Sequence, residues 1–180
     1  KLAAALGPGV DRSKIQSDIT ELQNQLKGVA DSASFSGENW LSVDSSATGY
    51  NATKSIVSSF TRNSSGAVSI GYITVDTSKA VLFDAGTGTG AGGILDSQRD
   101  SAGAVVSTGG TSIMNIDISS LDNSATDQAT LSGYVQAVSK ALDEMTSAAT
   151  GLGANQTRIN LQSDCAIRSR RASLSSLTLT

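Results

Sequence analysis

Apolar residues recur in an early stretch of the chain at alternating spacings of four and three. The positions are Ile15, Ile19, Leu22, Leu26 and Val29. This spacing is typical of a helix with a narrow apolar seam, as in coiled coils, and not of the broader apolar face of a globular-core helix. We predict a helix over about 13–33, in which Ser13 and Gln16 form an N-terminal capping box.

The same alternation continues for longer near the other end of the chain. Its positions are Leu131, Val135, Val138, Leu142, Met145, Ala149, Leu152, Gln156 and Ile159. We predict a helix over about 126–162, with Asp122 or Ser124 as its cap and Asp127 in its first turn. At 1.5 Å per residue this helix is roughly 55 Å long, which is too long for the core of a compact domain of this size.

Between the two seams the apolar period shortens to that of strands. Residues 67–75, 79–83 and 113–118 are predicted strands, and residues 35–43 suggest a short hairpin. The stretch 48–59 favours no single state. The predicted fold is therefore α+β, a long antiparallel helical stalk with an inserted β-rich outer region.

The seams need partners, because each buried aliphatic side chain contributes about 1.5–3 kcal/mol and an isolated helix cannot gain that. They pair either with each other or with helices outside this chain. Pairing with each other brings the chain ends together and leaves the β-rich middle at the far end of the stalk. The alternative is two ordinary amphipathic helices of one globular domain.

Composition removes most catalytic chemistry. The 180 residues include no His and a single Cys, which excludes His-based triads and Cys-rich zinc sites. The net charge of -3 argues against nucleic-acid binding, and no apolar run is long enough to span a membrane. The Lys1–Leu6 start is too short for a signal peptide and reads better as the end of a helix.

A glycine motif and a group of central aspartates do not predict a cofactor or metal site. Residues 88–93 match G-x-G-x-x-G, but no helix pattern follows them, so they do not predict a dinucleotide site. The spacing of the central acids does not fit a calcium loop. These acids are Asp96, Asp100, Asp117, Asp122 and Asp127. Three N-glycosylation patterns, at Asn51, Asn63 and Asn155, are interpreted as chance matches in a Ser- and Thr-rich chain.

Two longer motifs resemble bacterial flagellins. The run from Ile15 to Leu26, followed by Ser34 to Leu41, is similar to the first part of the flagellin region called D1. The run from Leu142 to Leu161 resembles the C-terminal D1 helix, and its residues 153–159 match that helix's G-A-x-Q-N/T-R-L/I motif. The residues of these two motifs most resemble those of flagellins from soil-dwelling alphaproteobacteria.

The resemblance implies a structural subunit of the flagellar filament, without enzymatic activity, that self-assembles through its helices. Its implied partners are other flagellin subunits, hook-associated proteins, the filament cap and an export chaperone. The implied location is the extracellular filament, reached without a cleaved signal peptide. The packing residues carried over by motif are Ile19, Leu22, Leu26, Gln156, Arg158 and Ile159.

The resemblance also implies a division of the chain. We expect residues 1–43 to be the first D1 helix and hairpin, 44–112 the variable outer region, and 113–164 the C-terminal D1 strand and helix. Residues 165–180 form a basic tail that departs from the family, which we interpret as a frameshift, a truncation or an added tail. Without the family's inner-tube segment, we expect no polymerisation of this chain alone. A hook–filament junction protein and a secreted surface-binding module remain alternatives.

Overall fold

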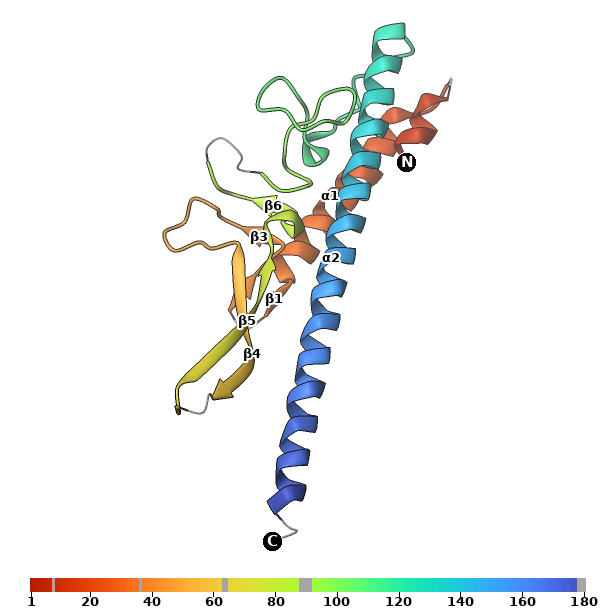
Figure 1. Cartoon of the computed structure of the whole chain (residues 1–180). Helices are drawn as coiled ribbons and strands as arrows, with labels where there is room; N and C mark the ends of the chain where they lie inside the picture. The colour runs from red at the N-terminus through yellow and green to blue at the C-terminus, as the bar shows by residue number, and fades with distance from the viewer. Residues whose placement is uncertain (8, 36, 63–64, 88–91, 178–180) are drawn as a thin grey trace. The chain divides into compact units, whose positions relative to one another are not determined.

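A computed structural model describes residues 1–7, 9–35, 37–62, 65–87 and 92–177 of the chain (Figure 1). The chain divides into two compact units. The first comprises Lys1–Tyr50 with Lys79–Ser147, and the second comprises Asn51–Ser78 with Ala148–Thr180. Helices and short strands are mixed along the chain, which confirms the α+β class.

The first predicted helix is present as α1, Arg12–Ser32. Its cap differs from the predicted capping box, because the Asp11 carboxylate accepts a hydrogen bond from the Lys14 backbone N–H at 3.2 Å. Ser13 lies inside the helix, where its carbonyl accepts from the Ser17 hydroxyl. The capping-box prediction was therefore wrong, although the helix itself is confirmed. A short 3-10 helix, η1 (Leu2–Leu6), precedes α1.

The second predicted helix is present as α2, Ala125–Leu177, and it is longer than predicted. The Ser124 hydroxyl accepts from the Asp127 N–H at 3.2 Å, which confirms Ser124 as its cap. In turn, the Asp127 carboxylate accepts from the Asp122 N–H at 2.8 Å. No proline follows Pro8, so nothing in the backbone chemistry ends the helix at the basic tail.

The longest strands form one antiparallel hairpin. Strand β4 (Thr53–Arg62) pairs with β5 (Val68–Asp76), with a bulge between Val57 and Ser59. The predicted strand at 67–75 is confirmed as β5, and the ambiguous stretch 48–59 contributes to β4. Gly71 lies opposite Ser59, whose hydroxyl leaves no room for a Cβ at residue 71.

Two further pairs are very short. Strand β1 (Ser34–Phe35) pairs antiparallel with β2 (Glu38–Asn39), which confirms a hairpin at the start of the predicted range 35–43. Strand β3 (Ser42–Val43) instead pairs in parallel with β6 (Phe83–Asp84).

Two predicted strands were wrong. Residues 79–83 form the end of a 3-10 helix, η2 (Ser78–Ala80), and only the start of β6. Residues 113–118 begin with another 3-10 helix, η3 (Ile113–Asn115). Their backbone groups bond to glutamine side chains of α1 and not to a neighbouring strand, as described below.

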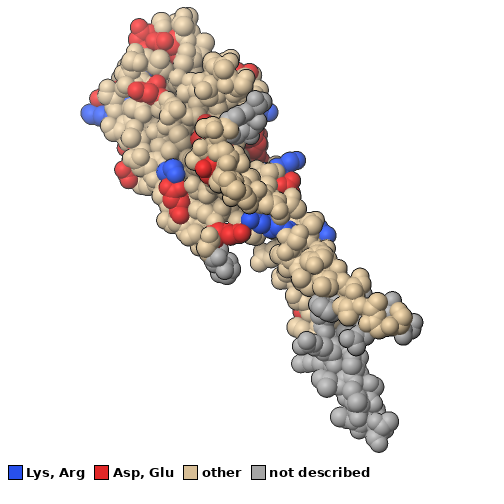
Figure 2. All heavy atoms as spheres, turned by 90° about the vertical axis from the view of Figure 1, so that its left-hand side faces the viewer, with Lys and Arg blue, Asp and Glu red and all other residues tan. Residues whose placement is uncertain are grey.

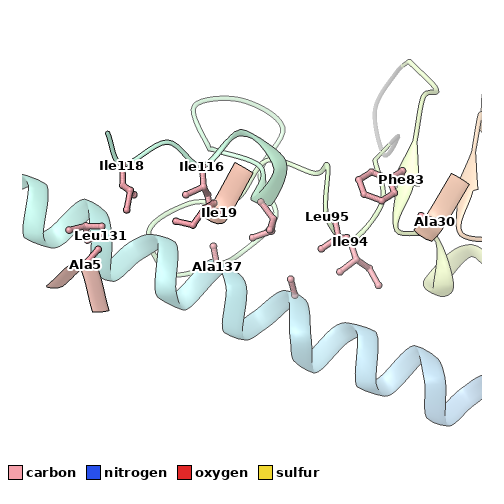
Figure 3. Close-up of a cluster of buried hydrophobic side chains, with 12 residues drawn as sticks. Ala5, Ile19, Ala30, Phe83, Ile94, Leu95, Ile116, Ile118, Leu131 and Ala137 are labelled. Atoms are coloured by element: carbon pink, nitrogen blue, oxygen red, sulfur yellow. The ribbon is translucent and has the colours of Figure 1, made fainter. Parts of the chain in front are cut away.

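The core of the first unit is a single cluster of aliphatic and small side chains with one phenylalanine, Phe83. It draws on η1, α1, β6, residues 94–95, residues 113–118 and the start of α2. Ile118 and Leu131 are fully buried, and in Figure 3 they lie next to Ala5. Figure 3 also places Ile116 beside Ile19, on the side of the cluster that faces Ala137 of α2. The cluster thus contains residues of both predicted seams.

Candidate assembly surface

The face of α1 that is buried within the first unit is partly polar. Gln23 is buried and donates through Nε2 to the carbonyls of Ile113, at 2.9 Å, and Ile116, at 3.3 Å. One heptad earlier, Gln16 accepts from the Ile118 N–H through Oε1 at 3.0 Å. These two side chains bond to the carbonyls of Ile113 and Ile116 and to the Ile118 N–H, which are groups that a neighbouring strand would otherwise pair.

Arg12 fixes the N-terminal end of the same face. Its buried guanidinium donates to the Ala5 carbonyl at 3.2 Å, to the Leu121 carbonyl at 3.0 Å and to the Asn123 side chain at 2.8 Å. Three separate segments therefore converge on one side chain. Sequence reasoning missed Arg12, Gln16 and Gln23 as anchors, although the heptad spacing of the two glutamines was visible.

The apolar seam of α1 leaves the core after its second residue. Ile19 is buried and Ile15 packs against the cluster, whereas Leu22, Leu26 and Val29 are 47%, 37% and 67% exposed. We call these three residues the α1 stripe. The stripe is an exposed apolar row beside the buried face of the same helix.

The seam of α2 behaves in the same way within the first unit. Leu131 is fully buried, and Met145 packs against the cluster. Val135 is half-buried, while Val138 and Leu142 are 36% and 61% exposed. We call Val138 and Leu142 the α2 stripe. The positions that α2 buries most completely beyond Leu131 are the small residues Gly133, Ala137 and Ala141, which lie to one side of the seam.

In the second unit the predicted positions of α2 are mixed. Leu152 and Ile159 are half-buried, whereas Gln156 and Arg158 are exposed. The Arg158 guanidinium donates to the Asn155 side chain at 3.4 Å. Leu161 and Ile167, which lie after the predicted positions, are also exposed apolar residues of this helix.

An ion pair lies beside the α1 stripe. Lys27 pairs with Asp31 at 2.6 Å, and its ammonium lies 5.1 Å from the centre of the Phe83 ring. Hydrogen bonds from Lys27 and then Ser42 lower the pKa of Asp31. Over the face shown in Figure 2, acidic and basic side chains stand in small groups separated by uncharged surface.

The central acids are engaged locally. Asp117 accepts from Ser119, and Asp100 accepts from Ala102 and Ala104. In the described part of the chain, no three Cys, Asp or Glu residues gather as metal ligands, and no helix is long and apolar enough to cross a membrane. Residues 88–91 of the glycine motif, and Asn63 of one glycosylation pattern, lie outside the described residues.

Comparison with known proteins finds flagellins. The chain is 39% identical to Flagellin C of Rhizobium meliloti (strain 1021) over 174 residues, which cover 90% of this chain and 52% of that protein. The chain is similar to rhizobial flagellins. It is also 52% identical over 97 residues to Flagellin A of the same strain, a match that covers 53% of this chain and 23% of that protein.

A third flagellin shows the same level of similarity. Flagellin D of Rhizobium meliloti is 50% identical over 101 residues, which cover 56% of this chain and 24% of that relative. The predicted resemblance to flagellins of soil bacteria is thus confirmed. No family model matches the chain. The chain spans about half the length of Flagellin C.

Proposed function

We propose that this chain is part of a structural subunit of a bacterial flagellar filament and has no catalytic role. The observation that carries the proposal is the 39% identity to Flagellin C over 90% of the chain. A filament subunit must keep apolar surface for its neighbours, and the exposed residues of the two stripes are surface of that kind.

The stripes are the proposed contacts between copies. In this proposal, Leu22, Leu26 and Val29 of α1 and Val138 and Leu142 of α2 pack against helices of other flagellin subunits, while Ile15, Ile19 and Leu131 hold the subunit together. Each exposed aliphatic side chain would gain about 1.5–3 kcal/mol on full burial. The predicted antiparallel stalk is the arrangement that brings both stripes into such contacts, and Leu152, Gln156, Arg158 and Ile159 extend it.

The remaining predictions carry over as parts of the same proposal. The partners are other flagellin subunits, with hook-associated proteins, the filament cap and an export chaperone, and the location is the extracellular filament. Residues 1–43 and 113–164 would supply the packing region, residues 44–112 the outer region, and residues 165–180 a basic tail.

A chimera tests the function directly. The matched part of Flagellin C is replaced by the matched part of this chain in a Rhizobium meliloti strain without other flagellins. We expect filaments by electron microscopy and swimming in soft agar, with unmodified Flagellin C as the positive control. A chimera that is secreted and folded but forms no filament would contradict the proposal.

A substitution in the α2 stripe tests the proposed contact. Leu142→Asp in the chimera places a charge on a side chain that is 61% exposed in the subunit, so the subunit keeps its fold. We expect filaments to be lost while secretion continues, because the charge would be buried between copies. The matched control is Ser132→Asp, at an exposed serine of the same helix that is ten residues from Leu142 and outside the stripe. Equal assembly of both variants would place the contact elsewhere.

The two other predicted functions find less support. A hook–filament junction protein and a surface-binding module would each have relatives of their own kind. The relatives described above are flagellins, which favours the filament subunit.

A further inference from the structure

One arginine of the first unit is buried completely. The Arg99 guanidinium forms two parallel hydrogen bonds to the Glu144 carboxylate of α2, from Nη1 at 3.1 Å and from Nη2 at 2.6 Å. The same two nitrogens donate to the carbonyls of Gly103 and Ile94, each at 3.0 Å. Bidentate pairs of this kind fix direction as well as distance, so Arg99 joins its own loop to one place on α2.

The backbone of Arg99 also holds the loop together. Its N–H donates to the Thr111 carbonyl at 3.1 Å, and the Thr111 N–H donates back at 3.0 Å. The Val106 N–H donates to the Gln98 carbonyl at 2.8 Å. Residues 94–111 are therefore folded around the residue that fastens them to the helix.

Close backbone contact with α2 completes this arrangement. A Cβ on Gly103 would lie 2.9 Å from the Gln136 carbonyl oxygen, and a Cβ on Gly133 would lie 3.1 Å from the Ser101 Cα. No side chain fits between loop and helix at these two points. The first residues of the loop are also attached elsewhere, because the Ile94 and Leu95 N–H groups donate to the Val81 and Leu82 carbonyls at 2.9 and 3.0 Å. The outer residues of the loop are largely exposed, and Val105 is 58% exposed.

The charge of Arg99 rests on a single carboxylate that water can reach. The Arg99 side chain is 0% exposed and the Glu144 side chain is 45% exposed. Among the described residues, the buried Arg99 Nε has no hydrogen-bond partner. Without the Glu144 charge, a cation would be left unpaired in the interior, which is among the costliest defects in a protein. The relief available to the chain is to lift the loop into water.

From these contacts we propose that residues 98–111 form a strap, fastened on α2 by the Arg99–Glu144 ion pair, that opens as a unit while the rest of the first unit stays folded. The residues before the strap, Ile94 and Leu95, belong to the same buried cluster as Ala137 and Ala141 and stay in place. Closed, the strap limits the exposed apolar surface of this part of α2 to the α2 stripe. A role of the strap in selecting the face of α2 that contacts a second copy rests on the proposed function. The opening of the strap does not rest on it.

Trypsin measures the opening directly, because it cleaves after Arg99 only when that side chain leaves the interior. The variant Glu144→Gln is compared in the whole chain with Asp143→Asn, which removes the same charge from the exposed neighbouring residue. We expect cleavage between Arg99 and Asp100, followed by mass spectrometry, to be about tenfold faster in Glu144→Gln. Cleavage after the buried Arg12 should stay slow in both variants.

Each alternative result overturns the proposal. Equal cleavage after Arg99 in the two variants would show that Glu144 does not fasten the strap. A parallel rise at Arg12 and Arg99 would show that the first unit unfolds as a whole and that no separate strap exists. Neither readout depends on filament formation, so the strap can fail while the proposed function stands, and the reverse.

Discussion

At the scale of single residues, Gly93 holds the turn between β6 and residues 94–95 in place. A Cβ at this position would overlap the Leu82 carbonyl group, and it would lie 2.5 Å from the Phe83 nitrogen. The Gly93 N–H donates to the Asp96 carboxylate, whose other oxygen accepts from the Asp84 N–H at 2.7 Å. The Asp96 carboxylate therefore holds both segments close together at Gly93. Only a residue without a side chain fits between them.

Gly93→Ala should therefore destabilise the first unit by about 1–3 kcal/mol, because the backbone must move to admit a methyl group. The matched control is Gly28→Ala in α1, where a Cβ would meet nothing within 4 Å. That change should stabilise the protein by about 1 kcal/mol through helix propensity. Urea denaturation followed by the fluorescence of the single tryptophan, Trp40, separates the two outcomes. Effects of the same sign would contradict the argument.

Asp84 makes the stability depend on pH in a defined direction. Burial raises the pKa of its carboxyl, but hydrogen bonds from Ser45, Gly86 and Gly92 outweigh it and hold the pKa below 3.8. The unfolded chain then binds the proton more readily than the folded chain. The contribution of Asp84 to the free energy of unfolding is present above the ordinary pKa of 3.8. It is lost as the pH falls through the lowered pKa of the folded chain.

The corresponding variant is Asp84→Asn. Its free energy of unfolding should fall below that of the natural chain at pH 6, and the gap should narrow steadily towards pH 3. Urea denaturation at several pH values measures the gap. Asp143→Asn, at an exposed carboxylate of α2, serves as the control for the loss of one negative charge. A gap that stays constant with pH would exclude Asp84 as the titrating group.

At the scale of elements, α1 shows how far local pattern reaches. Its seam predicted the helix, but Ser13 and Gln16 matched a capping box that does not form. The Gln16 side chain is used elsewhere, by the backbone of Ile116 and Ile118. Asp11, which lies two residues before Ser13, caps the helix instead. The Gln16 side chain bonds to residues about a hundred positions away and not to the start of its own helix. A local motif does not contain that information.

The cap assignment gives a direct test. Asp11→Ala should lower the free energy of unfolding by about 1 kcal/mol, because an N–H of the first turn loses its acceptor. Ser13→Ala should leave it unchanged or raise it by up to about 0.5 kcal/mol, since alanine favours the helix interior. Thermal unfolding followed by circular dichroism compares the two. A larger loss from the serine variant would restore the capping box.

The candidate surface, like α1, was predictable from the sequence only in part. The spacing of apolar residues identified both stripes as parts of seams, yet it could not say which seam residues the subunit buries itself. That choice depends on Gln23 of α1 and on the small residues Ala137 and Ala141 of α2, which draw the core to the side of each seam. The same long-range contacts turned the predicted strand at 113–118 into an anchored segment.

At the scale of the whole molecule, the β4–β5 hairpin is inserted through a narrow neck. The Thr77 N–H and hydroxyl both donate to the Ala52 carbonyl at 2.9 Å, and Thr53 pairs with Asp76 at the base of the ladder. The two ends of the hairpin segment therefore lie next to each other. An insertion closed in this way has no need to fold before the unit that carries it.

Replacing residues 54–75 by Asn-Gly should therefore leave the first unit folded. Thr53 and Asp76 are antiparallel partners, and Asn-Gly is the two-residue turn that best joins such a pair. We expect the cooperative urea transition reported by Trp40 to persist, with its free energy changed by no more than about 1 kcal/mol. Slow trypsin cleavage after Arg12 should persist as well, because the contacts of Arg12 lie within the first unit. Loss of the transition, or rapid cleavage after Arg12, would mean that the hairpin is required for the fold of the unit that carries it.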